Sequence, residues 1–472
     1  MHGNEKILDK EDMATTRLHM VMVPWSAFGH LIPFFQLALQ LAKAGIKVSF
    51  ISTPGNIKRL PNVPSNIATL LDLLVFPLPN LDDEQQLPEG CEATVDIPFE
   101  KIQYLKIAYD LLRQPVKQFV IDQKPDWILI DAIPHWMVEI AQEQHIPLIN
   151  FSVFSASVYS FFVNQTLTRS SPESLMSPPE WFGFSSPLRY PKSLATAMHE
   201  GFHGENASGI SDADRVHKIL QASKAVAFRT CPEYEAEYLN AFEKITGNGS
   251  KPVFPIGLLL PEKPQGRQTG EIFRWLDVQK PNSVVFVGFG SECKLSKEQT
   301  HEIAYGVELS GLPFLWALRK PHWAFNELDA LPCGFQERTR GRGMVCIGWA
   351  PQLEILGHSS IGGSLCHAGW GSIIETLQFG HSLVVLPFVI DQPLNARLLV
   401  DKGLGVEIER SEDGSFSRDD IAKALRLAMV SAEGEKLRIQ TREAAQVFGN
   451  RDLHDSYFNR FVEYLKENGA AN

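Results

Sequence analysis

Short runs of apolar residues alternate with longer amphipathic stretches along the chain, and this rhythm predicts strands that alternate with helices. In the first half, apolar runs with strand character cover 18–24, 46–52, 126–131 and 146–151. Helical patterns lie between or after them, at 31–44, 99–121, 136–144 and 233–245. Because strand, helix and strand follow one another through short links, we expect parallel βαβ units and an open α/β domain.

The same rhythm restarts after a stretch rich in glycine, proline and charge that runs from residue 248 to residue 267. Apolar strands are expected at 283–289, 361–366 and 383–389, with a helix over 373–379. A second α/β domain is therefore predicted, and the change in composition marks the link between the two. The predicted division is a disordered segment 1–16, a first domain 17–250, a linker 251–275, a second domain 276–450 and a final helix within 451–472.

Charge and composition narrow the class of partner. With 472 residues the chain is long enough for two domains, and its 44% hydrophobic content is that of a globular protein. A net charge of −11 argues against nucleic acid and anionic membranes as partners. The longest apolar region is interrupted by Pro24, Pro33 and Lys43, so no integral membrane association is expected. Six cysteines without paired spacing indicate free thiols, and we expect a cytoplasmic monomer.

A strand, a turn of small residues and a helix follow one another over residues 361–379. The first amides of a helix lack partners within the helix, and the helix dipole favours an anion beside them. Gly369 and Gly371 let the backbone approach such an anion closely, while Ser372 offers a hydroxyl and His367 a ring N–H. This arrangement indicates a phosphate-binding site.

Residues on either side of this turn suit the other parts of a nucleotide sugar. Trp349 offers a flat face to a base, and Glu375, three residues after Ser372, can accept hydrogen bonds from a ribose. Asp391 and Gln392 follow the next predicted strand, and together they can bind adjacent sugar hydroxyls.

Taken in order, residues 349–392 resemble the signature of plant family 1 glycosyltransferases, which use UDP-sugars and have the GT-B fold. The resemblance implies an α/β protein of two Rossmann-like domains that face each other across a cleft, with the final helix packed back on the first domain. It implies a UDP-sugar co-substrate, no cofactor and no metal. The donor-binding residues it implies are Ser291, Trp349, Ala350, Gln352, His367, Trp370, Gly371, Ser372, Glu375, Asp391 and Gln392.

Within that set, the resemblance places uracil on Trp349, the uridine against Gln352, the diphosphate at His367 and Ser372, and the ribose at Glu375. The resemblance assigns binding of the transferred sugar to Asp391 and Gln392.

The chain departs from the family pattern at two positions. The usual cysteine after the histidine is Ala368, and the usual asparagine before the serine is Gly371. That asparagine normally reaches the diphosphate, so a backbone amide or a water is expected to take its place here.

A second set of residues suits proton transfer. His30 and Asp131 each follow a predicted parallel strand of the first domain, and the carboxyl ends of such strands gather at one crevice. A histidine whose far nitrogen meets a carboxylate is a general base, because the carboxylate fixes the tautomer and stabilises the imidazolium. The resemblance implies that His30 removes the proton of the acceptor hydroxyl in an inverting transfer and that Asp131 pairs with it.

The resemblance also bears on the acceptor and on the sugar. The motif Phe289-Gly290-Ser291-Glu292 and the segments near 136 and 388–392 are most like the branch that extends a sugar on a flavonoid or terpenoid glycoside. An aglycone acceptor is the alternative. Gln392 favours UDP-glucose, with UDP-rhamnose as the main competitor. The irregular region 165–205 is expected to form a pocket wall, and candidates for an apolar acceptor wall are Trp25, Phe28, Trp136, Phe154 and Phe388.

Other readings of the chain stay open. A UDP-sugar epimerase would turn over its substrate without an acceptor, and a non-catalytic UDP-sugar binder would release no UDP. A nicotinamide dehydrogenase is disfavoured, since Gly288 and Gly290 do not complete a dinucleotide motif. The acidic pair in Asp212-Ala213-Asp214 resembles a metal–diphosphate motif, but it follows Ser211 just before a helical pattern, so we interpret it as the N-terminal cap of a helix.

Overall fold

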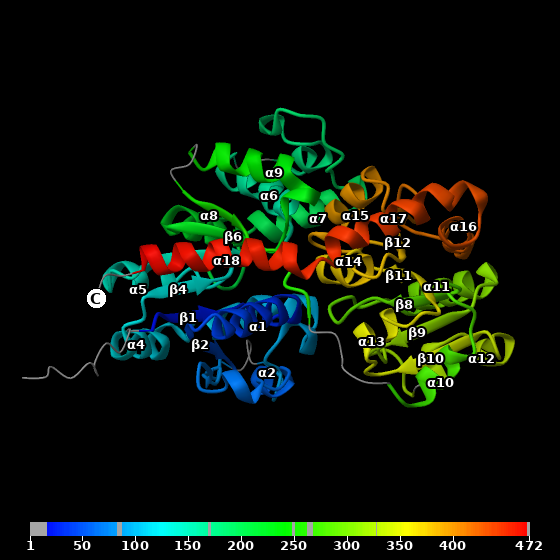
Figure 1. Ribbon diagram of the computed structural model, residues 1–472, viewed down its shortest axis with the longest axis horizontal. Helices are drawn as coiled ribbons and strands as arrows, with labels where there is room; N and C mark the ends of the chain where they lie inside the picture. The colour runs from blue at the N-terminus through cyan, green and yellow to red at the C-terminus, as the bar shows by residue number, and fades with distance from the viewer. Residues whose placement is uncertain are drawn as a thin grey trace, which may run out of the picture.

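The computed structural model describes residues 17–82, 87–168, 171–247, 251–261, 268–326 and 328–469, so the predicted disordered segment 1–16 lies outside the described residues. Two α/β units lie side by side (Figure 1), each built on a parallel sheet with helices on both faces. This confirms the predicted fold class, because the apolar runs of the sequence form buried parallel strands and the amphipathic stretches cover them.

The first sheet has the strand order β3-β2-β1-β4-β5-β6-β7 in the described residues. Its order runs outwards from β1 in both directions, so the carboxyl ends of β1 and β4 mark the switch point where ligands bind in such sheets. Its strands are β1 (His19–Val23), β2 (Lys47–Ser52), β3 (Leu71–Val75), β4 (Trp127–Ile130), β5 (Leu148–Ser152), β6 (Ala225–Phe228) and β7 (Val253–Pro255).

Helices on both faces of this sheet bury its apolar side chains. They are α1 (Phe28–Lys43), α2 (Pro54–Arg59), α3 (Ile102–Asp110), α4 (Arg113–Gln123), α5 (Met137–Glu143), α6 (Ala156–Thr168), α7 (Lys192–His203), α8 (Asp212–Ala222) and α9 (Pro232–Ile245). Short 3₁₀ turns are η1 (Ser65–Ile67), η2 (Thr94–Asp96), η3 (Phe99–Lys101), η4 (Pro172–Met176) and η5 (Glu180–Phe182).

The second sheet has the order β10-β9-β8-β11-β12-β13, again with every pair parallel. Its strands are β8 (Val284–Gly288), β9 (Phe314–Leu318), β10 (Gly343–Ile347), β11 (Ile361–Cys366), β12 (Ser382–Val385) and β13 (Gly405–Glu407). Its helices are α10 (Glu271–Asp277), α11 (Lys297–Ser310), α12 (Phe335–Arg338), α13 (Gln352–Leu356), α14 (Trp370–Leu377), α15 (Gln392–Asp401), α16 (Arg418–Met429) and α17 (Glu435–Phe448), with 3₁₀ turns η6 (Leu328–Ala330) and η7 (Ala432–Gly434).

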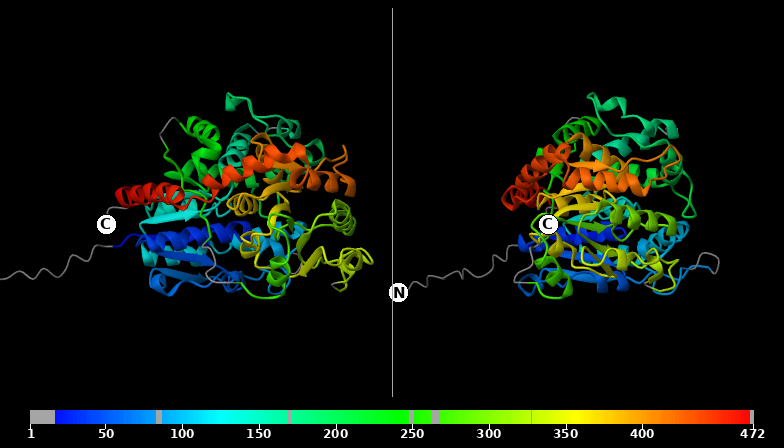
Figure 2. Two further views of the ribbon diagram at one scale, coloured as in Figure 1. Left: turned by 45° about the vertical axis from the view of Figure 1, so that its right-hand side comes forward. Right: turned by 90° about the vertical axis from the view of Figure 1, so that its right-hand side faces the viewer.

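The last helix, α18 (Arg451–Asn468), follows the second domain in the sequence but lies along the first (Figures 1 and 2). Phe461 and Leu465 are fully buried among the side chains of the first sheet. The indole N–H of Trp127 in β4 donates to the carbonyl of Leu465 at 3.1 Å. The chain therefore crosses between the domains twice.

The predicted linker 251–275 needs correction at both ends. Residues 253–255 form β7, which pairs with β6 as an edge strand of the first sheet. Beyond it, Phe273 and Leu276 of α10 are buried against β8 of the second sheet. Glycine, proline and charge are compatible with an edge strand and a short helix, so composition alone overestimated the length of the link.

Two other predicted elements differ from the structure. The single helix expected over 99–121 is broken into η3, α3 and α4, with Pro115 in the first turn of α4, where its missing N–H is tolerated. The irregular region 165–205 contains the end of α6 and all of α7. Gly201 within α7 and the prolines before it hid the helical period.

Candidate active site

His30 and Asp131 meet where β1 and β4 end. The two strands pair in register, with Val23 opposite Ile130, so the first turn of α1 and the residue after β4 lie at one edge of the sheet. Nδ1 of His30 is 2.6 Å from Oδ2 of Asp131. The carboxylate is buried, and it also accepts the backbone N–H groups of Trp25 at 3.1 Å and Ala132 at 2.7 Å.

The carboxylate determines what the imidazole can do. Because Asp131 accepts at Nδ1, the neutral ring of His30 carries its proton there, and Nε2 holds a lone pair. Burial alone lowers the pKa of His30, but the charge and hydrogen bond of Asp131, with Asp391 and Glu292, outweigh it and raise that pKa above its ordinary value. The predicted pair is thus formed, with the geometry of a general base and its positioning partner.

The predicted phosphate turn lies between β11 and α14. β11 spans the expected residues 361–366, and α14 begins at Trp370 with Gly369 as its extended N-cap. Ala368 has a φ of 62° and is fully buried, which turns the chain sharply from strand to helix. Gly371 and Ser372, both half-buried, follow in the first turn of α14, where backbone N–H groups lack helical acceptors.

His367 is held at this turn by close packing. It is buried, and an added Cβ at Gly290 or Gly369 would come within 2.7 or 2.6 Å of its ring. Burial lowers the pKa of His367 to about 4, so the ring is neutral near pH 7. Its Nδ1 is buried without a hydrogen-bond partner among the described residues. Ser291 is half-buried and directly follows Gly290, the residue that packs against this ring.

The predicted base and ribose residues lie around α13 and α14. Trp349 is 84% exposed, which leaves its indole free to stack on a planar ligand, and Ala350 is half-buried beside it. Nε2 of Gln352 donates to Oε2 of Glu375 at 2.7 Å. Burial raises the pKa of Glu375, while the hydrogen bond from Gln352 and the charge of Arg229 act against that rise.

Asp391 and Gln392 stand at the start of α15 with different roles. Oε1 of Gln392 accepts the backbone N–H groups of Phe388 at 2.9 Å and Val389 at 3.1 Å, so its amide nitrogen is the end left for a ligand. Oδ2 of Asp391 accepts from Nδ2 of Asn395 at 2.7 Å. Burial raises the pKa of Asp391 to about 6, although Asn395, His30 and the backbone N–H of Trp370 all favour its charged form.

Asp391 connects the two halves of the site. Its pKa is lowered by the backbone N–H at the start of α14, and its carboxylate lies near enough to His30 to raise the pKa of that imidazole. Glu292, also from the second domain, acts on His30 in the same direction. The imidazole of the first domain and the turn after Cys366 therefore share one site.

The side chain of Trp370, predicted in the donor-binding set, points into the core between the domains. Its indole is buried, donates to the carbonyl of Arg229 at 2.7 Å and stacks on Tyr234 at a centroid distance of 5.5 Å. Its backbone N–H, at the start of α14, lies near Asp391 and lowers the pKa of that carboxyl.

The predicted acceptor residues divide into two groups. Trp25 and Trp136 are buried in the first-domain core beside Tyr109, which explains their hydrophobicity without a ligand. Phe154 meets the His30 ring edge-on at 5.4 Å, so it borders the reacting position. Phe28 is half-buried under Arg59, and Phe388 is half-buried near Phe289, Arg410 and Phe416.

Sequence reasoning missed two buried polar residues beside the predicted site. Asn395 is buried, holds Asp391, donates to the carbonyl of Ala368 at 3.0 Å and accepts from Ser155 of the first domain at 3.2 Å. Its spacing of four residues from Asp391 on one helix was a usable signal. The second missed residue is Arg229, which directly follows β6. Its position at the carboxyl end of a buried strand was the only feature of the sequence that could have indicated it.

The acidic pair at the start of α8 has a structural role. The hydroxyl of Ser211 accepts the backbone N–H of Asp214 at 3.1 Å, which confirms the N-cap interpretation. Lys106 donates to both carboxylate oxygens of Asp212, at 2.6 and 2.7 Å.

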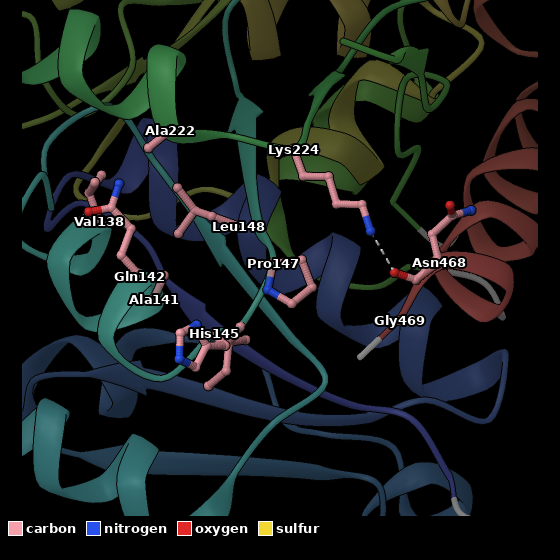
Figure 3. Close-up of a pocket in the computed structure, with 11 residues that line it drawn as sticks. Val138, Ala141, Gln142, His145, Pro147, Leu148, Ala222, Lys224, Asn468 and Gly469 are labelled. Carbon is pink, nitrogen blue, oxygen red and sulfur yellow. Dashed lines mark hydrogen bonds between the residues drawn. The ribbon is translucent and has the colours of Figure 1, made fainter. Parts of the chain in front are cut away.

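A surface pocket lies elsewhere, at the amino end of β5 (Figure 3). It is lined by Leu148, the first residue of β5, and by Lys224, which directly precedes β6. Nζ of Lys224 donates to the carbonyl of Asn468 at 2.9 Å. Because His30 and Asp131 lie at the carboxyl ends of the strands, this pocket is at the opposite edge of the sheet. No helix in the described part of the chain has the length and apolar character needed to cross a membrane.

Two Rossmann-like domains in this arrangement give the chain the GT-B fold. The family model for UDP-glucoronosyl and UDP-glucosyl transferase matches residues 256–435. UDP-glycosyltransferase 91A1 of Arabidopsis thaliana is 42% identical, covering 96% of this chain and 97% of that protein. Anthocyanidin-3-O-glucoside rhamnosyltransferase of Petunia hybrida is 33% identical, covering 95% and 96%.

A solved structure agrees with these relatives. Arabidopsis thaliana UGT89C1 complexed with UDP-L-rhamnose matches with a TM-score of 0.73 and 26% identity, covering 96% of this chain and 100% of that one. The chain belongs to plant family 1 of the UDP-glycosyltransferases, as its signature region predicted. It is an enzyme that transfers a sugar from a UDP-sugar donor.

Proposed function

We propose that this enzyme transfers glucose or rhamnose from its UDP-sugar, with inversion, to a sugar hydroxyl of a flavonoid or terpenoid glycoside. The observation that supports this most is the meeting of the His30–Asp131 pair with Asp391 and the first turn of α14. The general base of the first domain therefore faces the predicted phosphate-binding turn of the second domain. The acceptor oxygen attacks the anomeric carbon from the face opposite UDP while Nε2 of His30 takes its proton.

The departing diphosphate is stabilised in this proposal by the N-terminus of α14. Backbone N–H groups and the hydroxyl of Ser372 point at the developing charge, and His367, neutral near pH 7, donates one ring N–H. These fixed donors are preorganised for the leaving group, so we propose transfer without a metal ion or other cofactor. Trp349, Gln352 and Glu375 would hold the uridine, as the family resemblance implies.

His30→Ala tests the proposed base. Transfer should fall by about 10²–10⁴-fold, because no other group takes the acceptor proton, while UDP affinity stays within a few fold. Transfer rates and UDP calorimetry with the purified variant measure both. Transfer that survives the change at a comparable rate would show that His30 is not the base.

Glu292 supports the choice of a glycoside over an aglycone as acceptor. Its Oε2 accepts the hydroxyl of Thr94 at 2.9 Å, but its Oε1 is buried without a partner among the described residues. A buried carboxylate oxygen near His30 requires a hydrogen-bond donor, and a sugar hydroxyl supplies one. The name of the petunia relative, which specifies a glucoside acceptor, points the same way.

Glu292→Ala tests this choice against the alternative acceptor class. We expect kcat/KM to fall roughly 10–100-fold on monoglycosides and to change much less on the matching aglycones, since only the glycoside loses a hydrogen bond to a charged group. Thr94→Val is the control, because it removes the Thr94–Glu292 bond and leaves the free oxygen. Equal losses on both acceptor classes would favour direct action on aglycones.

A screen of UDP-glucose and UDP-rhamnose against aglycones and their monoglycosides, read by mass spectrometry, assigns the donor. We propose UDP-glucose on the basis of Gln392. Acceptor-independent turnover of the UDP-sugar would instead indicate an epimerase, and no turnover at all would indicate a binding protein. The cytoplasmic location and the monomeric state stay predictions.

A further inference from the structure

Arg229 is a buried cation at the boundary between the domains. It directly follows β6 and is 4% exposed. Its Nε donates to the carbonyl of Leu258 at 2.9 Å, and its Nη2 to Oε1 of Gln36 at 3.4 Å. Its backbone carbonyl accepts the indole N–H of Trp370. The backbone and two of the guanidinium nitrogens are thus fixed by neutral groups.

The third nitrogen faces the donor site. The side-chain hydrogen bonds of Arg229 to described residues use Nε and Nη2, and a Cβ added at Gly371 would lie 3.8 Å from Nη1 with nothing else within 4 Å. The negative charge that acts on Arg229 is that of Glu375, whose Oε2 is already hydrogen-bonded to Gln352. Burial lowers the pKa of Arg229 to about 10, so the guanidinium is charged at neutral pH. A buried charge without a paired anion is costly, and an arriving anion would offset that cost.

The signature region itself cannot supply this charge. Residues 349–392 contain neither lysine nor arginine, and the whole chain has a net charge of −11. Gly371 also lacks the amide that the family pattern has at this position. The diphosphate site therefore combines a missing polar side chain with an unpaired guanidinium that points at the same place.

We propose that Arg229 binds the diphosphate of the donor from the first domain, in place of the asparagine that the family signature has at position 371. The planar guanidinium suits two phosphate oxygens, and the absence of a side chain at Gly371 leaves the space for that contact. The donor then bridges both domains through its phosphates. This inference rests on the proposed function only in placing the diphosphate at the first turn of α14.

Arg229→Met tests the proposal through UDP and uridine affinity, measured by calorimetry on the full chain. UDP should bind at least about tenfold more weakly, whereas uridine, which has no phosphate, should bind as before. Lys224→Met is the matched control, because it removes a cation at the opposite end of the same strand, β6, and should leave both affinities unchanged. Equal losses for UDP and uridine, or no loss for UDP, would overturn the proposal.

A second variant tests the replacement itself. Arg229→Met combined with Gly371→Asn should recover UDP affinity to within about threefold of wild type, since the added Cβ has room and the amide restores a donor. If the double variant binds UDP no better than Arg229→Met, the replacement at position 371 is refuted.

The melting temperature without ligand serves as the control for correct folding of the variant. Arg229→Met should melt within a few degrees of wild type, because the lost bonds to Leu258 and Gln36 are offset by the removal of a buried charge, and the backbone bond to Trp370 stays. The rise in melting temperature on adding UDP should shrink. If Arg229→Met does not fold, Arg229→Gln gives the same comparison of UDP with uridine.

Ser372→Ala separates this inference from the proposed site. If Ser372→Ala weakens UDP binding and Arg229→Met does not, only the role of the arginine fails. If neither variant weakens UDP binding, the diphosphate does not lie at the start of α14, and the proposed site fails with it.

Discussion

At the residue scale, His30 shows how opposing effects set a pKa. Burial disfavours the imidazolium, but Asp131 at 2.6 Å, with Asp391 and Glu292, favours it more. A raised pKa makes Nε2 a stronger base, at the cost of a smaller neutral fraction below neutral pH. Activity should therefore decline as the pH falls through the pKa of His30, because the protonated ring cannot accept a proton.

Asp131→Asn should move the acid limb of the pH–rate profile to lower pH. The substitution removes the charge and the acceptor that raise the pKa of His30, and leaves burial, which lowers it. The maximal rate should also fall, by about 10²–10⁴-fold, because the tautomer of His30 is no longer fixed.

The measurement is kcat/KM for the acceptor from pH 5 to 9. A limb that stays in place in Asp131→Asn would mean that His30 does not control it. UDP affinity, measured at the same pH values, serves as the control, since Asp131 has no proposed contact with the nucleotide.

Residue types with a distinctive chemistry could be assigned from the sequence, and side-chain direction could not. His30 and Asp131 were paired because both follow parallel strands. Trp370 was placed with the donor although its ring turns into the core against Tyr234. Which way a side chain at the start of a helix points depends on the domain packed against it, and that information is absent from the local pattern.

At the element scale, the strand–turn–helix unit of β11 and α14 depends on His367 keeping its place. The ring fits only because Gly290 and Gly369 lack side chains. The strand was predicted at 361–366 and is found there, whereas α14 starts three residues before the predicted 373. An aromatic residue next to two glycines gives no helical period, so periodicity placed the start too late.

Gly290→Ala should weaken UDP binding through His367. The new Cβ would lie 2.7 Å from Cε1 of that ring, which must shift away from the phosphate turn. Gly311→Ala is a matched control, because Gly311 has a similar φ, 72° against 66°, but nothing lies within 4 Å of its added Cβ.

Both alanine variants should lose about 1–2 kcal/mol of stability from the left-handed backbone. Only Gly290→Ala should also lose UDP affinity, as calorimetry of the two purified variants will show. If Gly311→Ala loses as much UDP affinity as Gly290→Ala, the loss of affinity comes from reduced stability and not from a displaced His367.

At the scale of the whole molecule, one of the apolar clusters is shared by the two domains. Phe228 and Tyr234 of the first domain belong to the same buried cluster as Trp370 and Ile373 of the second. Hydrogen bonds cross the boundary as well, from Trp370 to Arg229 and from Ser155 to Asn395. The sequence predicted two domains from composition, but a shared core depends on packing between distant segments and has no local signal.

We therefore expect a single unfolding transition in differential scanning calorimetry, since the cluster between the domains is complete only when both are folded. Trp370→Ala should remove about 3–5 kcal/mol, the cost of a large cavity in a buried cluster. It should also begin to separate the transitions of the two domains. Two separate transitions in the wild-type protein would show that the shared cluster does not couple them.

The position of α18 has a consequence for synthesis. Phe461 and Leu465, which cover the first sheet, leave the ribosome only after every strand of the second domain has been made. Until then the apolar face that receives them is open to solvent and to other nascent chains. We expect the first domain to need a holding chaperone during translation. It should complete its folding only when the second domain has also been made.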